Sequence, residues 1–195
     1  MPNYKELIKE IANDLGFHQV SFASLAPLEN ERAHFSKWLD MSFQGTMNYM
    51  AREHETRLDP ARPLPQAKSV IVLAVNYFTP RPPKPGPFHG AVASYAVGRD
   101  YHLVIPEKIS LFKNRVDQLL NQTSEYRTCT DSAPVYELGL AARHGIGFSG
   151  KHTLIIGPKL SGSYNFLCEL FLDTDLETFG IKPDGPYQGT CGDCR

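Results

Sequence analysis

One uninterrupted apolar run, at residues 68–75, limits the possible folds of this chain more than any other segment. The run reads KSVIVLAV, so it is rich in β-branched residues and alternates little between polar and apolar positions. This pattern is typical of a strand that is buried on both faces. We therefore expect residues 68–75 to form the central strand of a layered domain.

Further strands and helices are predicted on both sides of this run. Apolar residues recur with the period of a helix in four segments, at residues 7–15, 29–41, 106–120 and 135–144. Strand-like segments occupy residues 18–22, 126–130, 153–156 and 165–172. Alternating strands and helices predict an α/β domain of three layers, with a β-sheet flanked by helices. Because no clear helix separates the last two strands, we expect a mixed sheet with an antiparallel part.

Prolines indicate how two of the connections are built. The five prolines within residues 79–87 cannot donate hydrogen bonds to a β-ladder, so this segment is expected to be a loop. Pro106 suits the first turn of a helix, where its missing N–H would have no partner in any case. The sequence therefore predicts that the helix carrying Ile109 and Phe112 begins close to Pro106.

The net charge of the chain does not favour binding to polyanions such as nucleic acids. The chain has 195 residues and carries 20 Lys and Arg against 21 Asp and Glu, for a net charge of −1. Binding to nucleic acid would therefore need a local basic patch. No apolar run approaches the ~20 residues of a membrane span, and the N-terminus lacks the apolar core of a secretory signal. The expected location is the cytoplasm, with no membrane partner.

The chain ends in a closely spaced cysteine pair, Cys191 and Cys194. A Cys-x2-Cys pair brings two thiolates to one metal centre, but a closed zinc or iron–sulfur site needs four ligands. The other two cysteines, Cys129 and Cys168, lie far upstream in predicted strands and are expected to be buried. The ending therefore predicts half of a metal-binding motif.

A carboxylate follows one of the predicted strands directly. Asp131 begins the sequence DSAP at residues 131–134, between a strand and a helix, at the edge of the sheet where α/β proteins bind ligands. The structural alternative is a helix N-cap, in which Asp131 or Ser132 accepts a hydrogen bond from a backbone N–H. Spacing alone favours the cap. The functional alternative is a carboxyl group whose pKa is raised by burial, so that it can donate a proton.

Three glycines lie close together in the sequence GIGFSGKH at residues 145–152. They allow tight turns, and Lys151 and His152 could contact phosphate or carboxamide groups. The segment follows a helix and precedes a strand, which is the reverse of a dinucleotide-binding fingerprint, so we reject that interpretation. Taken alone, the segment is better explained as a glycine-rich connection with solvated side chains.

Two polar stretches have equally ordinary explanations. Residues 99–102, RDYH, precede the Pro106 helix, so their aspartate is either a helix cap or part of a loop facing a substrate. Arg52 and Arg57 lie where a short helix is expected to end, and cations there are favoured by the helix dipole.

Taken in order, six segments of this sequence resemble the epoxyqueuosine reductases, cobalamin- and iron–sulfur-dependent enzymes that make queuosine in tRNA. The segments read GTMNYMAR at 45–52, YAVGRDYH at 95–102, DSAP at 131–134, GIGFSGKH at 145–152, FLCEL at 166–170 and CGDC at 191–194. Six ordered segments are far more specific than any one of them.

The resemblance implies two domains. Residues 1–180 would form a cobalamin-binding α/β domain similar to that of reductive dehalogenases. Residues 181–195 would begin a ferredoxin-like domain with [4Fe–4S] clusters, in which Cys191 and Cys194 are metal ligands. The family pattern continues to four cysteines and a proline, so we expect a chain truncated inside the first ferredoxin motif, unable to complete a cluster by itself.

The resemblance also implies a reaction, the removal of the epoxide oxygen of epoxyqueuosine in tRNA. Asp131 would be the general acid, kept protonated by burial beside the corrin, and reduced cobalt would supply electrons or the nucleophile. The residues expected to surround the cobalamin are Arg57, Asp131, Lys151, His152 and Ile155. Those expected near the reacting group are Asp100, Tyr101 and His102. The expected partners are a tRNA anticodon stem-loop and an electron-donor protein, with a monomeric chain.

Some positions depart from the family, and two other functions stay open. Leu138 stands where many members have Arg, Phe148 replaces a Trp, and Ser94 stands where an Arg is common. One alternative is a non-catalytic cobalamin-binding or scaffold protein whose cysteine pair serves a partner. The other is a reductive-dehalogenase-like activity on a small halogenated or epoxide compound.

Overall fold

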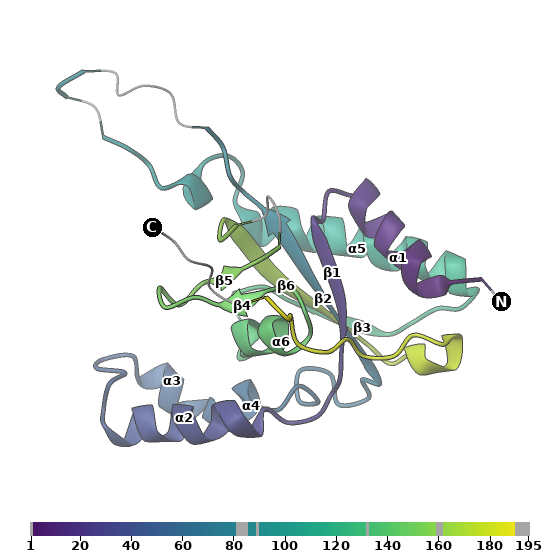
Figure 1. Ribbon diagram of the computed structural model, residues 1–195, viewed down its shortest axis with the longest axis horizontal. Coiled ribbons are helices and arrows are strands. Elements are labelled where there is room, and N and C mark those ends of the chain that lie inside the picture. The colour runs from purple at the N-terminus through teal and green to yellow at the C-terminus, as the bar shows by residue number, and fades with distance from the viewer. Residues whose placement is uncertain (1, 81–85, 89, 132, 159–161, 190–195) are drawn as a thin grey trace.

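A four-stranded antiparallel sheet forms the centre of the protein (Figure 1). The computed structural model describes residues 2–80, 86–88, 90–131, 133–158 and 162–189. The strands are β1 (Gln19–Ala23), β2 (Ser69–Asn76), β6 (Asn165–Leu172) and β3 (Tyr126–Cys129), in that spatial order. The apolar run found in the sequence is β2, whose first six residues are buried, so the prediction of a central buried strand is confirmed.

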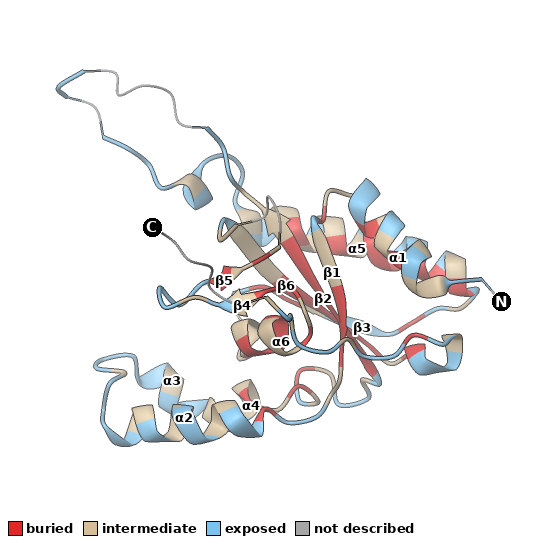
Figure 2. Ribbon diagram, in the orientation of Figure 1, coloured by how far each residue is buried: buried red, intermediate tan, exposed pale blue. Residues whose placement is uncertain are grey.

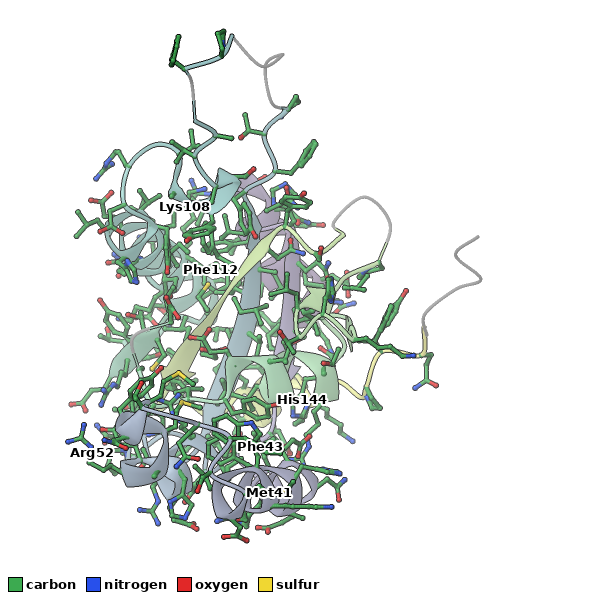
Figure 3. All side chains as sticks on the ribbon, turned by 90° about the vertical axis from the view of Figure 1, so that its left-hand side faces the viewer. Met41, Phe43, Arg52, Lys108, Phe112 and His144 are labelled. Carbon is green, nitrogen blue, oxygen red and sulfur yellow. The ribbon has the colours of Figure 1, made fainter. Side chains whose placement is uncertain are left out.

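Helices cover both faces of this sheet (Figure 1). One face carries α1 (Tyr4–Asp14) and α5 (Tyr101–Leu120), and the other carries α6 (Glu137–Arg143). The buried residues accordingly divide into two clusters, one on each side of the sheet (Figure 2). On the α5 side, Phe112 is fully buried and meets Phe17 edge-on, with ring centroids 5.8 Å apart (Figure 3). The predicted three-layer α/β fold is confirmed.

The sheet differs from the expected mixed sheet in the direction of its pairing. All three ladders described for this sheet are antiparallel. The strands β2 and β3, joined through α5, do run parallel to one another, as strand–helix–strand alternation predicts. They are not hydrogen-bonded neighbours, however, because β6 inserts between them and pairs with both. A strand from late in the chain therefore turns a predicted mixed sheet into an antiparallel one.

The helix α5 begins at Tyr101, five residues before the predicted start at Pro106. The side chain of Asp100 caps it by accepting a hydrogen bond from the backbone N–H of His102, at 2.9 Å. This cap satisfies an N–H that the first turn leaves without a partner inside the helix, so the helix can begin ahead of the proline. The polar residues 99–102 thus form the start of a helix, and Asp100 plays the capping role that the sequence allowed.

A helical extension lies beside the α6 face of the sheet (Figure 1). It consists of α2 (Glu29–Asp40), α3 (Asn48–Arg52) and α4 (His54–Arg57), and none of these three helices contains a fully buried residue. Met41 and Phe43, just after α2, are exposed (Figure 3). This extension therefore presents apolar side chains to solvent.

The remaining elements are short. The strands β4 (Phe148–Ser149) and β5 (Ile155–Ile156) form a small antiparallel hairpin next to α6, of which only the second strand was expected. The 3₁₀ helices are η1 (Ser94–Ala96) and η3 (Leu176–Phe179). No helix in the described ranges is both long enough and apolar enough to cross a membrane.

The chain after residue 180 stays attached to the sheet. Asp184 pairs with Phe22 of β1 through two hydrogen bonds: its N–H donates to the Phe22 carbonyl, and its carboxylate accepts from the Phe22 N–H. The same carboxylate forms an ion pair with Lys5 of α1 at 2.5 Å. The backbone carbonyl of Asp184 lies 2.8 Å from Nδ1 of His144, at the end of α6. One residue therefore joins two layers of the domain.

Candidate active site

The N-terminal end of α5 and the end of β3 meet at the carboxyl group of Asp131. The hydroxyl of Tyr101 donates a hydrogen bond to Oδ2 of Asp131 at 2.5 Å. Nε2 of His102 lies 3.6 Å from the same oxygen. Asp131 lies 30 positions after Tyr101 in the chain, so the fold brings its carboxyl group together with two of the residues expected near the reacting group.

Asp100 fixes the orientation of the His102 ring. Its carboxylate accepts from the backbone N–H of His102 and lies 2.8 Å from Nδ1 of the imidazole. These hydrogen bonds hold the pKa of Asp100 below its ordinary value. An ionised carboxylate only accepts hydrogen bonds, so Nδ1 carries a proton and Nε2 is the nitrogen that faces Asp131.

Stacking fixes the Tyr101 ring in the same way. The ring lies between those of His102 and Phe166, with centroid separations of 4.0 and 4.1 Å. Burial raises the pKa of Tyr101, and the hydrogen bond to Asp131 raises it further. Tyr101 therefore remains a protonated donor to Asp131 throughout the neutral range.

Asp131 itself adopts an unusual backbone conformation. Its φ angle is +56°, in the left-handed region that non-glycine residues seldom occupy. Its side chain is 65% exposed, so the protein alone does not supply the burial that the family resemblance implied. The backbone N–H of Asp131 donates to Oε1 of Glu137 at 2.6 Å, which ties the turn to the start of α6. Asp131 is therefore held by its backbone, with its carboxyl group projecting toward Tyr101.

A cavity of about 250 Å³ lies beside this carboxyl group. It combines apolar side chains with a small number of polar ones, as is usual for ligand sites. Its lining residues are Tyr101, Thr130, Asp131, Glu137, Leu138, Thr153, Leu154, Ile155, Asn165, Phe166 and Leu167.

Two further carboxyl groups were assigned no role from the sequence: that of Glu137 is half-buried and lines the cavity, and that of Glu169 is fully buried. Burial raises the pKa of Glu137 to about 7, and the charge of the Asp131 carboxylate adds to this rise. The hydrogen bond from the Asp131 N–H and the charge of Arg57 act in the opposite direction and lower the pKa. Glu169, in the middle of β6, is 0% exposed, and burial followed by the charge of Glu137 raises its pKa well above the ordinary range. The one signal in the sequence was a glutamate inside the apolar run FLCELFL.

The residues expected around cobalamin lie in two groups. Ile155 lines the cavity, whereas Lys151 and His152 are exposed on the β4–β5 turn and do not line it. Arg57 ends α4 with its guanidinium carbon 5.8 Å from the centroid of the Tyr49 ring. Its buried Nε has no hydrogen-bond partner among the described residues. The structure therefore brings only Ile155 of these four to the cavity of Asp131.

The glycines before this turn have a packing explanation. A Cβ atom at Gly147 would lie 2.3 Å from the carbonyl oxygen of Ile156, so only glycine allows β4 to approach β5 so closely. Gly145 has a φ angle of +89°, which glycine adopts without strain. The glycines therefore serve the hairpin, and the rejection of a dinucleotide-binding loop agrees with this geometry.

The cysteines divide as the sequence indicated. Cys129 and Cys168 are buried free thiols of β3 and β6. Cys191 and Cys194 lie outside the described residues. Among the residues that are described, no group of three or more His, Cys, Asp or Glu side chains is placed to hold a metal ion.

Comparisons with known proteins agree with the family named from the sequence. The family model described as "Epoxyqueuosine reductase QueG, DUF1730" matches residues 57–132. An epoxyqueuosine reductase of Leadbetterella byssophila is 36% identical over 194 residues, which cover 100% of this chain and 61% of that protein. This chain therefore spans less than two thirds of that relative.

Solved structures give the same result for the fold. The epoxyqueuosine reductase of Streptococcus thermophilus matches with a TM-score of 0.84 and 28% identity, over 100% of this chain and 51% of that one. An epoxyqueuosine reductase solved with an epoxyqueuosine-modified tRNA-Tyr stem loop matches with a TM-score of 0.75 and 26% identity, over 97% and 49%. A B12-dependent reductive dehalogenase, at 19% identity and a TM-score of 0.55, shares the fold over 98% of this chain and 22% of its own. The chain therefore matches the epoxyqueuosine reductase family along its whole length, both in sequence and in fold.

Proposed function

We propose that this chain provides the catalytic region for the reduction of epoxyqueuosine to queuosine in tRNA, with Asp131 as the acid that protonates the departing epoxide oxygen. The observation that carries the proposal is the placement of Tyr101 and His102 around the Asp131 carboxyl group, beside a cavity. The names of the relatives and of the solved neighbours support the reaction.

The contacts of Asp131 suggest which oxygen carries the proton. Tyr101 and His102 both approach Oδ2. We therefore assign the transferable proton to Oδ1. The hydroxyl of Tyr101 stabilises the carboxylate that remains after the transfer, because a hydrogen bond to an ionised oxygen is stronger than one to a neutral oxygen. General acids placed in this way typically accelerate a reaction by about 10²- to 10⁴-fold.

Cobalamin is the cofactor that the family resemblance implies, and the apolar lining of the cavity supports this assignment. A volume of about 250 Å³ is below the roughly 300–1,000 Å³ of typical small-molecule sites, so the cavity would hold only part of the cofactor. Leu154, 46% exposed on the β4–β5 hairpin, offers apolar surface there. The unpaired buried Nε of Arg57 and the exposed side chains of Lys151 and His152 would hold polar groups of the cofactor. When bound, reduced cobalamin supplies the electrons of the reduction.

The metal and partner assignments are further parts of this proposal. We assign residues 1–180 to the cobalamin-binding domain and residues 181–195 to the start of a ferredoxin-like domain, where Cys191 and Cys194 would be ligands of a [4Fe–4S] cluster. Their Cys-x2-Cys spacing supports this role. The partners would be a tRNA anticodon stem-loop, as in the tRNA-bound neighbour, and an electron-donor protein. A cytoplasmic, monomeric chain is expected.

Titration of the purified chain with cob(II)alamin tests the proposal first. We expect the visible and EPR spectra of the cofactor to change on binding, both for the wild type and for Asp131→Asn. With chemically reduced cofactor and an epoxyqueuosine-containing stem-loop, the wild type should form queuosine at least about 100-fold faster than Asp131→Asn, the lower limit for a lost general acid. The exposed Asp14→Asn is the matched control and should behave as the wild type. A spectrum of cob(II)alamin that is unchanged by the wild-type protein would refute the cofactor assignment, and equal rates for Asp131→Asn and the wild type would refute the role of Asp131.

A further inference from the structure

The backbone of Asp131 is held by a half-buried carboxyl group six residues later in the chain. Oε1 of Glu137 accepts a hydrogen bond from the Asp131 N–H at 2.6 Å. Asp131 lies at φ +56°, a conformation that a non-glycine residue keeps only when surrounding contacts impose it. Glu137 supplies such a contact, because its side chain reaches from the first residue of α6 to the turn that precedes the helix.

The strength of that contact depends on whether Glu137 is ionised. A carboxylate accepts a shorter and stronger hydrogen bond from a backbone N–H than a protonated carboxyl group does. Burial raises the pKa of Glu137 to about 7. Loss or gain of one proton by Glu137, within the neutral pH range, therefore strengthens or weakens the hydrogen bond that holds the Asp131 turn.

Charged and titratable groups face Glu137 from several elements. Asp131 lies on the preceding turn and Arg57 on α4, and their charges act on the pKa of Glu137 in opposite directions. Tyr101 of α5 lines the same cavity as Glu137. Glu169 lies on β6 beneath α6, with both carboxyl oxygens lacking a hydrogen-bond partner in the part of the chain that is described. Burial is the main cause that raises the pKa of Glu169 and of the neighbouring thiols Cys129 and Cys168, and the charge of Glu137 adds to it. Ionisation of Glu137 therefore further favours the neutral forms of these deeper groups.

We propose that Glu137 is the positioning residue for Asp131, and that its ionisation sets how firmly the Asp131 turn is held toward Tyr101 and His102. The inference rests on the proposed function only in naming Asp131 as the acid. The coupling also acts in reverse. A negative charge on Asp131, left after it transfers its proton, favours the uptake of a proton from solvent by Glu137 and so loosens the turn.

The amide signal of Asp131 tests this inference without cofactor or substrate. The 195-residue chain, labelled with ¹⁵N-aspartate, is titrated from pH 5 to pH 9 while the Asp131 amide is followed by NMR. We expect the amide proton to move downfield through one inflection near pH 7, as Glu137 ionises. Glu137→Gln keeps the size of the side chain and an acceptor oxygen, so the protein should fold but the inflection should disappear.

Glu169→Gln is the matched control, since it changes the other carboxyl group in the same way. Because the hydrogen bond of the Asp131 N–H is accepted by Glu137 and not by Glu169, the Asp131 inflection should persist in that variant. Persistence of the inflection in Glu137→Gln, its loss in Glu169→Gln, or its absence from the wild type would each overturn the inference. The δ-carboxyl ¹³C signal of Glu137 in the wild type decides the matter if Glu137→Gln does not fold, since it must titrate together with the Asp131 amide.

This test is separate from that of the proposed function. A chain that does not bind cob(II)alamin but whose Asp131 amide follows Glu137 would refute the proposed cofactor and leave the positioning role intact. A chain that binds cob(II)alamin but lacks the inflection would refute the positioning role alone.

Discussion

Replacing Glu169 by Met should stabilise this protein, and by an amount that depends on pH. Both carboxyl oxygens of Glu169 are buried without a hydrogen-bond partner among the described residues. Leaving a buried polar group unpaired costs about 1–3 kcal/mol. Met is unbranched and of similar length, so it removes these polar atoms while filling much of the same space.

The protonation of Glu169 adds a second contribution above pH 4. In the unfolded chain its carboxyl group has an ordinary pKa of about 4.3 and loses its proton as the pH rises, whereas the raised pKa in the folded state retains it. The folded state thus binds more protons, and the stability contributed by this group decreases with rising pH by about 1.4 kcal/mol per pH unit. This loss continues with rising pH until the raised pKa of the folded state is reached.

We therefore expect Glu169→Met to raise the free energy of unfolding by about 1–3 kcal/mol at pH 4, and by a larger amount at pH 7, because the buried carboxyl group costs more stability as the pH rises. Urea denaturation followed by far-ultraviolet circular dichroism at both pH values measures the difference. Leu170→Met, one residue along β6 and on the opposite face of the sheet, is the control and should cost under about 1.5 kcal/mol at either pH. A gain for Glu169→Met that is the same at pH 4 and pH 7, or a loss at pH 7, would refute the reasoning.

Two further substitutions test contacts that hold the outer parts of the domain. Asp184→Ala removes the acceptor for the Phe22 N–H and should lower the free energy of unfolding by about 1–3 kcal/mol in urea denaturation. As a control, Asp14→Ala at an exposed position should change the free energy of unfolding by less than about 0.5 kcal/mol. Equal effects of the two substitutions would contradict the argument. Gly147→Ala places a Cβ against the Ile156 carbonyl oxygen and should cost about 1–3 kcal/mol by the same measurement. Gly90→Ala, where a Cβ would meet nothing within 4 Å, is its control, and a stability of Gly147→Ala equal to that of the control would show that the hairpin tolerates a wider spacing.

Local patterns in the sequence predicted where helices and strands lie along the chain better than they predicted which strands pair with one another. The strand expected at residues 165–172 has those bounds in β6, because an apolar run with aromatic residues is a local signal. The insertion of β6 between β2 and β3 leaves no such signal, since pairing between distant segments is decided by packing. The early start of α5 was missed because capping by Asp100 outweighed the position of Pro106.

The same limit applies to the candidate site. Family resemblance supplied Asp131, Tyr101 and His102, and the structure brings them into contact. It did not supply the carboxyl groups of Glu137 and Glu169. The environment of these two carboxyl groups depends on α6 lying over β6. The period of apolar residues in a sequence predicts which face of a strand or helix a residue occupies, but not which element covers that face.

The attachment of Asp184 to Phe22 also protects an edge of the sheet. As the first strand in the spatial order, β1 has one side on which the described residues place no neighbouring strand. Unpaired backbone groups on such a side are a template for pairing with another molecule, which leads to aggregation. Asp184 occupies both the N–H and the carbonyl group of Phe22. The segment that follows η3 therefore hinders pairing of the β1 edge with a strand of another molecule.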